Sequence, residues 1–466
     1  MPLSRAKPVS VFVLLFAAVI GDWNLASSAF AVRPEALERP AAAAVAEPAA
    51  KPPLVLLVGG MTYDLKRPSG PWGAAHAATA DKPATYTGMI GALVQSGYRF
   101  GGTVTAAAGK VELPAGIPAE ADLFVLEFSP AAQVDGLGIK ALELAACLKE
   151  LRRATGRDSV QIVAHSAGGI VARTYLQSAL PGLKYAGDVR SLTTISTPHF
   201  GSELATHLGD WLGTRATSLQ PGAPLIRQLN SELELPTDVH FASIVVRGLG
   251  ADVQGEGSAY DSYVDHDFLR TLPIDYCLGG DQVVHVRSQN LAIAPCARRY
   301  EAATKRPVHY LAVRVEDPSP QDSWPCQTTV HEVSPHDADV QSAVQAFLAT
   351  GRDAVAADKR VADKAVGVDP VAPIELLYAR CQARTLLEET ADVIHKCSQV
   401  VSSRDLELTE FRREGDRIRA TFTGTTIARG PLRVLNYTTK IKGDLTLELD
   451  AFGRPRGLHY DAKRVK

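Results

Sequence analysis

The sequence lacks two features that would narrow its function at once: a long apolar run and an excess of charge of one sign. The apolar run near the start, Val11–Ile20, falls far short of the roughly 20 residues that a membrane-spanning helix needs, and no later segment reaches that length. The 49 basic residues nearly balance the 51 acidic ones, so no overall field attracts a polyanion. We therefore expect no membrane-spanning helix and no nucleic-acid partner.

The first 31 residues have the features of a cleavable export signal. Arg5 and Lys7 precede the apolar run, and a polar stretch then leads to residues 29–31, which fit an AxA cleavage site. We expect residues 1–31 to be a signal peptide, and the mature protein to be secreted or periplasmic.

Six cysteines are few for a chain of this length, but export would place them where disulfides persist. Cys147 lies in an Ala/Leu-rich helical run and is expected to be a buried free thiol. A bridge between Cys381 and Cys397 is the first expectation. The pairing of the other three, for which Cys277 with Cys296 is one option, stays open: Cys277, Cys296 and Cys326. No cysteine spacing resembles a zinc site.

Composition divides the rest of the chain into successive parts. Residues 32–53 are rich in Ala and Pro and predict a spacer. Strand-like and helix-like runs alternate over residues 54–350, with a long amphipathic insertion at about 202–238 that we interpret as a helical lid. A charged linker, residues 351–372, leads to a small α+β domain at 373–466. At 466 residues, one large and one small folded unit are expected.

The pattern of apolar residues predicts the class of fold. The strands expected in the large domain are apolar throughout, which indicates a parallel sheet covered by helices on both faces, the α/β class. These strands are Leu54–Val58, Leu123–Phe128, Val160–Val163, Ser191–Ser196 and Phe241–Val246, and the expected helices are Tyr86–Gln95, Leu137–Ala154 and Val340–Leu348. In the small domain we expect a helix at Ile374–Ile394 and half-buried antiparallel strands at Leu406–Phe411, Arg417–Phe422 and Leu445–Leu449.

The most informative stretch is Ala164–Gly169, which reads AHSAGG. It follows the expected strand Val160–Val163 and opens a helix-like run at Ile170. A serine on such a strand-to-helix turn is held in a strained backbone conformation, with its hydroxyl exposed at the carboxyl edge of a sheet. This is the arrangement of a nucleophile elbow, which makes Ser166 the candidate nucleophile. The alternative is that Ser166 only caps the helix.

Four segments in a fixed order resemble secreted bacterial lipases and esterases of the α/β-hydrolase superfamily. They read VAHSAGG, STPHFG, GDQVV and VHE, and the resemblance covers about residues 54–350. The elbow has Ala164 where the usual pattern has glycine, as in the AxSxG lipases. Gln282 and His285 depart from the Gly and Pro positions of the DGxVP segment. The small C-terminal domain resembles no family that we can name.

The resemblance implies a catalytic triad in the chain order serine, acid, histidine. The acid is expected at Asp281, with Asp252 as the rival nearer to the preceding strand. The histidine is expected at His331, because His336 stands almost at the start of the last helix. His199 precedes the acid, against this order, and the resemblance makes it part of the pocket wall; His165 occupies the variable position of the elbow and is expected to point away from the serine.

Two backbone amides should form the oxyanion hole. The residue after the nucleophile, Ala167, supplies one. The other is expected from Met61, where the chain leaves the first strand through Gly59 and Gly60; this loop resembles the HGM segment of bacterial lipases with Gly59 in place of the histidine. The alternative is a plain glycine turn.

The resemblance implies an exported serine hydrolase that cleaves carboxylic esters, with hydrophobic acyl or lipid esters as substrates, through an acyl-serine intermediate. The substrate would bring it into transient contact with a lipid surface. The same triad could instead pass the acyl group to an alcohol or cleave a polyester. A different class of function, a non-catalytic binding protein of the cell envelope, would make the C-terminal domain the working part. No cofactor or metal is expected; Asp337 and Asp339, near the place where some bacterial lipases bind calcium, are taken as solvated.

Overall fold

The computed structural model describes residues 53–60, 70–76, 84–107, 110–206, 217–248, 280–281, 283–315, 330–360, 373–394, 399–429 and 436–465. The expected signal peptide, almost all of the spacer, Met61 and Asp252 lie outside these ranges. Among the described helices, none is both long and apolar enough to span a membrane.

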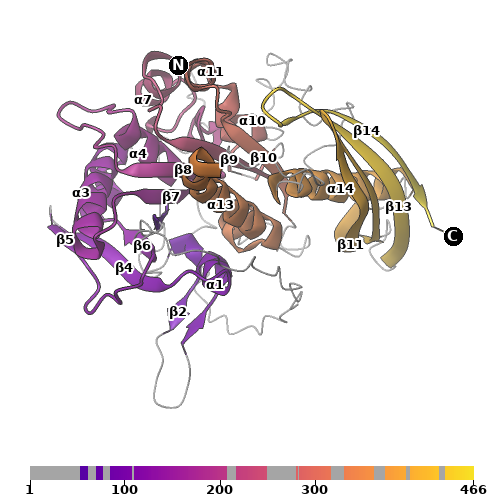
Figure 1. The fold of residues 1–466 in the computed structure, drawn as a ribbon, viewed down its shortest axis with the longest axis horizontal. Helices are drawn as coiled ribbons and strands as arrows, with labels where there is room; N and C mark the ends of the chain where they lie inside the picture. Colours follow the sequence, from indigo (N-terminus) through magenta and orange to yellow (C-terminus); the bar gives the residue numbers. More distant parts are fainter. Residues whose placement is uncertain are drawn as a thin grey trace, which may run out of the picture. The chain divides into compact units, whose positions relative to one another are not determined.

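An eight-stranded sheet forms the centre of the large domain (Figure 1), with strand order β10-β9-β8-β7-β1-β6-β4-β5. All neighbouring pairs are parallel except β4 with β5. The strands are β1 (Leu54–Val58), β4 (Phe100–Ala107), β5 (Lys110–Glu112), β6 (Leu123–Glu127), β7 (Val160–His165), β8 (Val189–Ile195), β9 (His240–Arg247) and β10 (His309–Arg314). The predicted α/β class is confirmed. A separate two-stranded ribbon pairs β2 (Ala75–His76) with β3 (Thr85–Tyr86).

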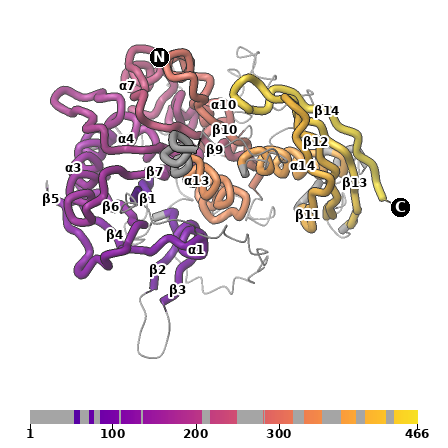
Figure 2. The backbone as a smooth tube through the Cα atoms, in the orientation of Figure 1, coloured from indigo at the N-terminus to yellow at the C-terminus, as the bar shows by residue number. Residues whose placement is uncertain are grey.

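Successive side chains of a central strand enter two different cores, because neighbouring residues of a strand point to opposite faces. In β1, Leu54, Leu56 and Val58 pack into the core that contains α3 (Leu137–Thr155) and α4 (Ala167–Leu176). The alternate residues of β1 pack into the core that contains α1 (Gly88–Gln95) and α13 (Ala338–Arg360). Both faces of the sheet are therefore covered, which is why its strands are apolar throughout. The course of the backbone through these layers can be followed in Figure 2.

Several elements of the large domain have weak sequence signals. The strand β4 contains two glycines, and β10 begins with polar residues because it lies at the edge of the sheet. Neither strand was predicted. The remaining short helices are α2 (Pro130–Asp135), α7 (Pro224–Arg227), α10 (Val286–Gln289), α11 (Pro295–Thr304) and α12 (Val330–Val333).

The described end of the predicted lid is anchored in the body of the domain. After α7 the chain makes one turn of π-helix, Gln228–Glu232, in which Leu229 is fully buried. The backbone carbonyl of Leu229 accepts two hydrogen bonds of 2.7 Å each. One comes from Arg173 in α4, and the other from Gln177, the residue that follows α4. Residues 217–239 are thus packed against the core of the domain. The rest of the predicted lid, residues 207–216, lies outside the described ranges.

The C-terminal module consists of one helix, α14 (Pro373–Ile394), on a four-stranded antiparallel sheet. Its strands are β11 (Gln399–Glu414), β12 (Arg417–Arg429), β13 (Asn436–Leu449) and β14 (Pro455–Arg464), in that order. Gly415, between β11 and β12, and Gly453, between β13 and β14, have positive φ angles of 64° and 76°, which glycine adopts at no steric cost. The predicted α+β architecture is confirmed.

Two expectations need correction: where the last helix of the large domain ends, and how the cysteines pair. The helix α13 continues to Arg360, well into the segment predicted as a linker. Cys147 is a buried free thiol as predicted, but Cys296 and Cys381 are also free and buried. Because Cys296 and Cys381, which lie in the described ranges, are free thiols, the structure contains neither the expected Cys381–Cys397 bridge nor the optional Cys277–Cys296 bridge. The partners proposed for them, Cys277 and Cys397, lie outside the described ranges, as does Cys326.

Candidate active site

Ser166 lies on the sharp turn between β7 and α4. Its φ of 57° and ψ of −137° lie in a region that non-glycine residues rarely adopt. The turn is held by a hydrogen bond from the Ser166 amide to the Ile195 carbonyl, at 2.9 Å. A Cβ atom on Gly168 would come within 2.5 Å of the Val58 carbonyl oxygen, so the helix can approach β1 only with glycine there. The side chain of Ser166 makes no capping hydrogen bond, which excludes the reading of this serine as a helix cap.

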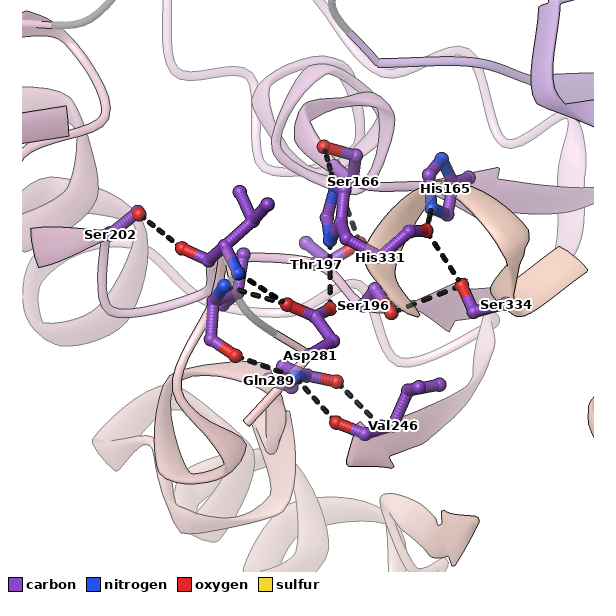
Figure 3. A network of polar contacts seen from close by, with 12 residues as sticks. His165, Ser166, Ser196, Thr197, Ser202, Val246, Asp281, Gln289, His331 and Ser334 are labelled. Atoms are coloured by element: carbon purple, nitrogen blue, oxygen red, sulfur yellow. Dashed lines mark hydrogen bonds and ion pairs between the residues drawn. The ribbon is translucent and has the colours of Figure 1, made fainter. Parts of the chain in front are cut away.

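The structure brings Ser166, His331 and Asp281 together at the carboxyl edge of the sheet (Figure 3). His331 Nδ1 lies 2.7 Å from Asp281 Oδ2, and His331 Nε2 lies 2.9 Å from Ser166 Oγ. Because an ionised carboxylate can only accept, the hydrogen lies on Nδ1 of the imidazole, and this N–H donates a hydrogen bond to Asp281. This leaves Nε2 free to accept the hydroxyl hydrogen of Ser166. The three residues therefore form a continuous relay for a proton.

Asp281 is fully buried and fixed by its own turn. Its Oδ1 accepts hydrogen bonds from the amides of Val283 and Val284, at 3.0 and 2.7 Å, while Oδ2 accepts from His331. The backbone carbonyl of Asp281 accepts a further bond from the His331 amide, at 3.0 Å. These contacts fix the orientation of the buried carboxylate toward His331. The predicted acid thus contacts the predicted base through both side chain and backbone.

His165 supports His331 from the side opposite the acid. The carbonyl of His331 accepts hydrogen bonds from His165 Nε2, at 2.9 Å, and from Ser334 Oγ, at 3.0 Å (Figure 3). The two imidazole rings lie 4.8 Å apart. Burial, and then the neighbouring His331, hold the pKa of His165 well below its usual value. A neutral ring adds no positive charge beside His331. Sequence reasoning missed this role, since the two residues are far apart in the chain.

Gly60 brings the backbone after β1 directly against the nucleophile. A Cβ atom on Gly60 would lie 2.7 Å from Ser166 Cβ, 2.8 Å from the Ala167 amide nitrogen and 3.0 Å from Ser166 Oγ. Only glycine permits this approach. The Ala167 amide stands at the N-terminus of α4, where backbone donors and the helix dipole favour negative charge. The second predicted donor, Met61, lies outside the described residues.

The rival histidines have structural partners. His199 is completely buried, with Nε2 3.1 Å from Thr194 Oγ1 and Nδ1 3.3 Å from Arg173 Nη1. Burial and the charge of Arg173 hold its pKa well below the usual value. His336 lies against Gly88 of α1 instead of the serine.

The STPHFG segment, predicted to shape the pocket wall, braces the elbow itself. Thr197 Oγ1 donates to the carbonyl of Ser166 at 2.9 Å, and its side chain fills the space beside Gly169.

Asp339 is buried and Asp337 is only partly exposed, and both have protein partners, which corrects the expectation from the sequence. Asp337 Oδ1 accepts from the amides of Asp339 and Val340, at 2.9 and 3.1 Å, and so caps α13. Asp339 is paired with Arg384 of α14, at 2.6 Å. Burial chiefly, against the opposing charge of Arg384, raises the pKa of Asp337 to about 6. Within the described ranges, no group of three or more His, Cys, Asp and Glu side chains could hold a metal ion.

A mostly parallel sheet, a strained serine after a central strand, and an acid and a histidine after later strands together give the arrangement of the α/β-hydrolase fold. No family model matches the chain. Over 99 residues it is 37% identical to a triacylglycerol lipase of Pseudarthrobacter phenanthrenivorans, a match that covers 21% of this chain and 29% of the lipase. A triacylglycerol lipase of Burkholderia plantarii is also 37% identical over 99 residues, with 21% and 26% covered.

The chain therefore spans less than a third of the length of the curated relatives it matches. Among solved structures, a lipase of Bacillus licheniformis, BlEst2, is similar with a TM-score of 0.33 and 20% identity, covering 54% of this chain and 84% of that one. The phospholipase PlaB of Legionella pneumophila is similar with a TM-score of 0.37 and 15% identity, covering 76% and 66%. The predicted resemblance to lipases and esterases of the α/β-hydrolase superfamily is confirmed.

Proposed function

We propose that this protein is a serine hydrolase that cleaves carboxylic esters through an acyl-Ser166 intermediate. The observation that carries the proposal is the relay from Ser166 Oγ through His331 to Asp281, with contacts of 2.9 and 2.7 Å. A serine hydroxyl is a weak nucleophile, and a histidine oriented by a buried carboxylate is the arrangement that activates it.

In the first half of the reaction, His331 Nε2 takes the hydroxyl proton while Ser166 Oγ bonds to the ester carbonyl carbon. The carbonyl oxygen becomes an oxyanion, which the Ala167 amide stabilises together with the expected second donor, Met61. Asp281 stabilises the imidazolium that forms. His331 then returns the proton to the departing alkoxide oxygen, so that an alcohol leaves and the acyl group stays on Ser166. In the second half, a water molecule gives one proton to His331 Nε2 while its oxygen bonds to the acyl carbon. The bond from that carbon to Ser166 Oγ then breaks, His331 returns the proton to Oγ, and the carboxylic acid leaves.

Hydrophobic acyl or lipid esters are the substrate class that we propose. The support is the local similarity to proteins named triacylglycerol lipases and the near balance of basic and acidic residues, which suits an uncharged substrate. We also propose that the protein is exported. N-terminal sequencing of protein recovered outside the cytoplasm of an expressing bacterium should find residue 32 first; an intact Met1 there would contradict cleavage.

The hydrolase is tested by measuring hydrolysis of p-nitrophenyl esters of increasing acyl length by the wild type and Ser166→Ala. We expect turnover by the variant to fall by about a millionfold in kcat or to the background rate, with the wild type favouring long chains. Ser96→Ala, at an exposed serine at the end of α1, is the matched control and should retain activity. Turnover retained by Ser166→Ala would reject the mechanism, and a wild type that hydrolyses no ester would favour the binding-protein reading.

A further inference from the structure

A buried lysine binds the backbone beside the nucleophile. Lys140, on α3, is only 2% exposed. Its Nζ donates to the Gly60 carbonyl oxygen at 2.9 Å and to Gln133 Oε1 at 2.7 Å, and it lies 5.1 Å from the centre of the Phe128 ring. An ammonium group in an apolar core is costly unless its hydrogen bonds are satisfied, so these contacts are what allow the charge to be buried there.

The Gly60 carbonyl belongs to a stretch of backbone whose own residues provide no side chain to fix it. Two consecutive glycines, Gly59 and Gly60, follow β1, and glycine permits many backbone conformations. The lipase pattern has a histidine at the first of these positions, and this chain lacks it. The buried ammonium fixes the loop from the other side, through the carbonyl rather than through a side chain of the loop.

The orientation of one peptide group connects Lys140 to the oxyanion. A peptide unit is planar and trans, so the N–H at one end points away from the C=O at the other. A cation that holds the Gly60 carbonyl therefore restrains the peptide group to which the amide of Met61, the second donor expected from the sequence, also belongs. Gly60 itself lies against Ser166 and the Ala167 amide, as its missing Cβ shows. The positive charge of Lys140 beside the carbonyl oxygen also polarises the peptide group, which makes the N–H of that group a stronger hydrogen-bond donor.

We propose that Lys140 is a positioning residue of the oxyanion hole, which it holds through the Gly60 carbonyl. The inference rests on the proposed serine hydrolase function. It assigns to α3, which contributes no residue to the relay, the task that a loop side chain has in the related pattern. Lys140 acts on the transition state, where charge develops on the carbonyl oxygen, and not on the acyl chain of the bound ester.

The test compares Lys140→Met with Lys149→Met, the same substitution at an exposed lysine of the same helix. We measure kcat and KM with a p-nitrophenyl ester, with active sites counted by the final extent of fluorophosphonate labelling. We also measure the inhibition constant of an alkyl boronic acid, which forms a tetrahedral anionic adduct on the serine. Lys140→Met should lower kcat by about 10- to 100-fold, leave KM within about twofold, and weaken boronate binding in parallel with kcat. Lys149→Met should match the wild type.

The proposal would be overturned by a Lys140→Met enzyme with wild-type kcat. It would equally be overturned by one in which only KM rises and the boronate binds as in the wild type. If Lys140→Met does not fold, Lys140→Gln replaces it, because its amide keeps polarity at the site without the cation or the full reach; the same loss of kcat is expected and its absence is decisive. Failure of the hydrolase itself would be distinguishable, since the wild type and Lys149→Met would then also be inactive.

Discussion

The two sides of the candidate active site are built in different ways. The serine side is local: Ser166, its strained turn and its small neighbours occupy six consecutive positions, and β7 and α4 hold them. The histidine side is assembled from distant segments, because His331 depends on Asp281 in front and His165 behind. A short motif can therefore encode the nucleophile Ser166, whereas the base His331 reaches its position only when distant segments of the chain fold together.

On the histidine side, the largest loss of kcat is expected at Asp281. Asp281→Asn keeps the shape of the buried acid but presents an uncharged amide to His331, which disfavours the tautomer that the relay needs. We expect kcat to fall by about 10³- to 10⁴-fold with little change in KM. Steady-state kinetics with a p-nitrophenyl ester provide the measurement, and circular dichroism shows whether the variant is folded. A folded Asp281→Asn enzyme within tenfold of the wild type would show that Asp281 is not the acid.

The serine side has its own test in two adjacent glycines. Gly60→Ala would place a methyl group 2.7 Å from Ser166 Cβ and 2.8 Å from the Ala167 amide nitrogen. Gly59→Ala is the matched control, because its nearest neighbour, Pro71 Cδ, lies at an ordinary 3.5 Å. We expect Gly60→Ala to lose about 100-fold or more in kcat/KM and Gly59→Ala to lose far less. Equal kinetics for the two variants would contradict the close approach of this loop to the nucleophile.

The support of the histidine side extends into the C-terminal module. Arg384 of α14 pairs with Asp339, and the side chain of Arg384 is only 15% exposed. Asp339 lies in α13, the helix that follows the turn carrying His331. Arg384→Met would leave Asp339 with its more exposed partner, Arg380, and should lower the free energy of unfolding by about 2 to 3 kcal/mol. Arg380→Met, at a side chain 48% exposed, should cost less than about 0.5 kcal/mol. Urea unfolding would measure both, and similar values would refute the distinction.

The smallest expected effect is a pH dependence at Asp337, whose folded-state pKa is raised to about 6, chiefly by burial. The folded protein binds this proton more tightly than the unfolded chain, so the free energy of unfolding falls as pH rises from about 4 to about 6. Asp337→Asn keeps an oxygen that can cap α13 but cannot titrate. Urea unfolding at about pH 4 and about pH 6.5 should show a decrease roughly 1 to 2 kcal/mol larger in the wild type. Identical decreases would exclude a raised pKa at Asp337.

The sequence was sufficient for most of the architecture and for the three relay residues. Apolar strands such as β1 and β7 are recognisable because both of their faces are buried. The resemblance of the GDQVV segment to lipases pointed to Asp281, and the distance from the last helix favoured His331 over His336. The strand β4 was missed because its glycines carry no apolar signal. The short elbow motif, by contrast, contains the serine and the small residues that its strained turn requires.

The residues that support the site could not be read from the sequence. Lys140 lies in a helical run where lysine normally faces solvent, and only the folded chain brings it to Gly60. The pairing of Arg384 with Asp339 likewise joins two segments that the sequence separates by a presumed linker. From the sequence, His165 had no role beyond the variable position of the elbow, because its partner, the carbonyl of His331, belongs to a turn far away in the chain.

The most direct test of the account is the rate and site of labelling by a fluorophosphonate in the folded wild type and in His331→Ala. We expect peptide mapping to find the label on Ser166 alone in the wild type, and the rate to fall by at least about 1,000-fold in the variant, because nothing then removes the hydroxyl proton. A label on another residue, or an unchanged rate without the imidazole, would contradict it.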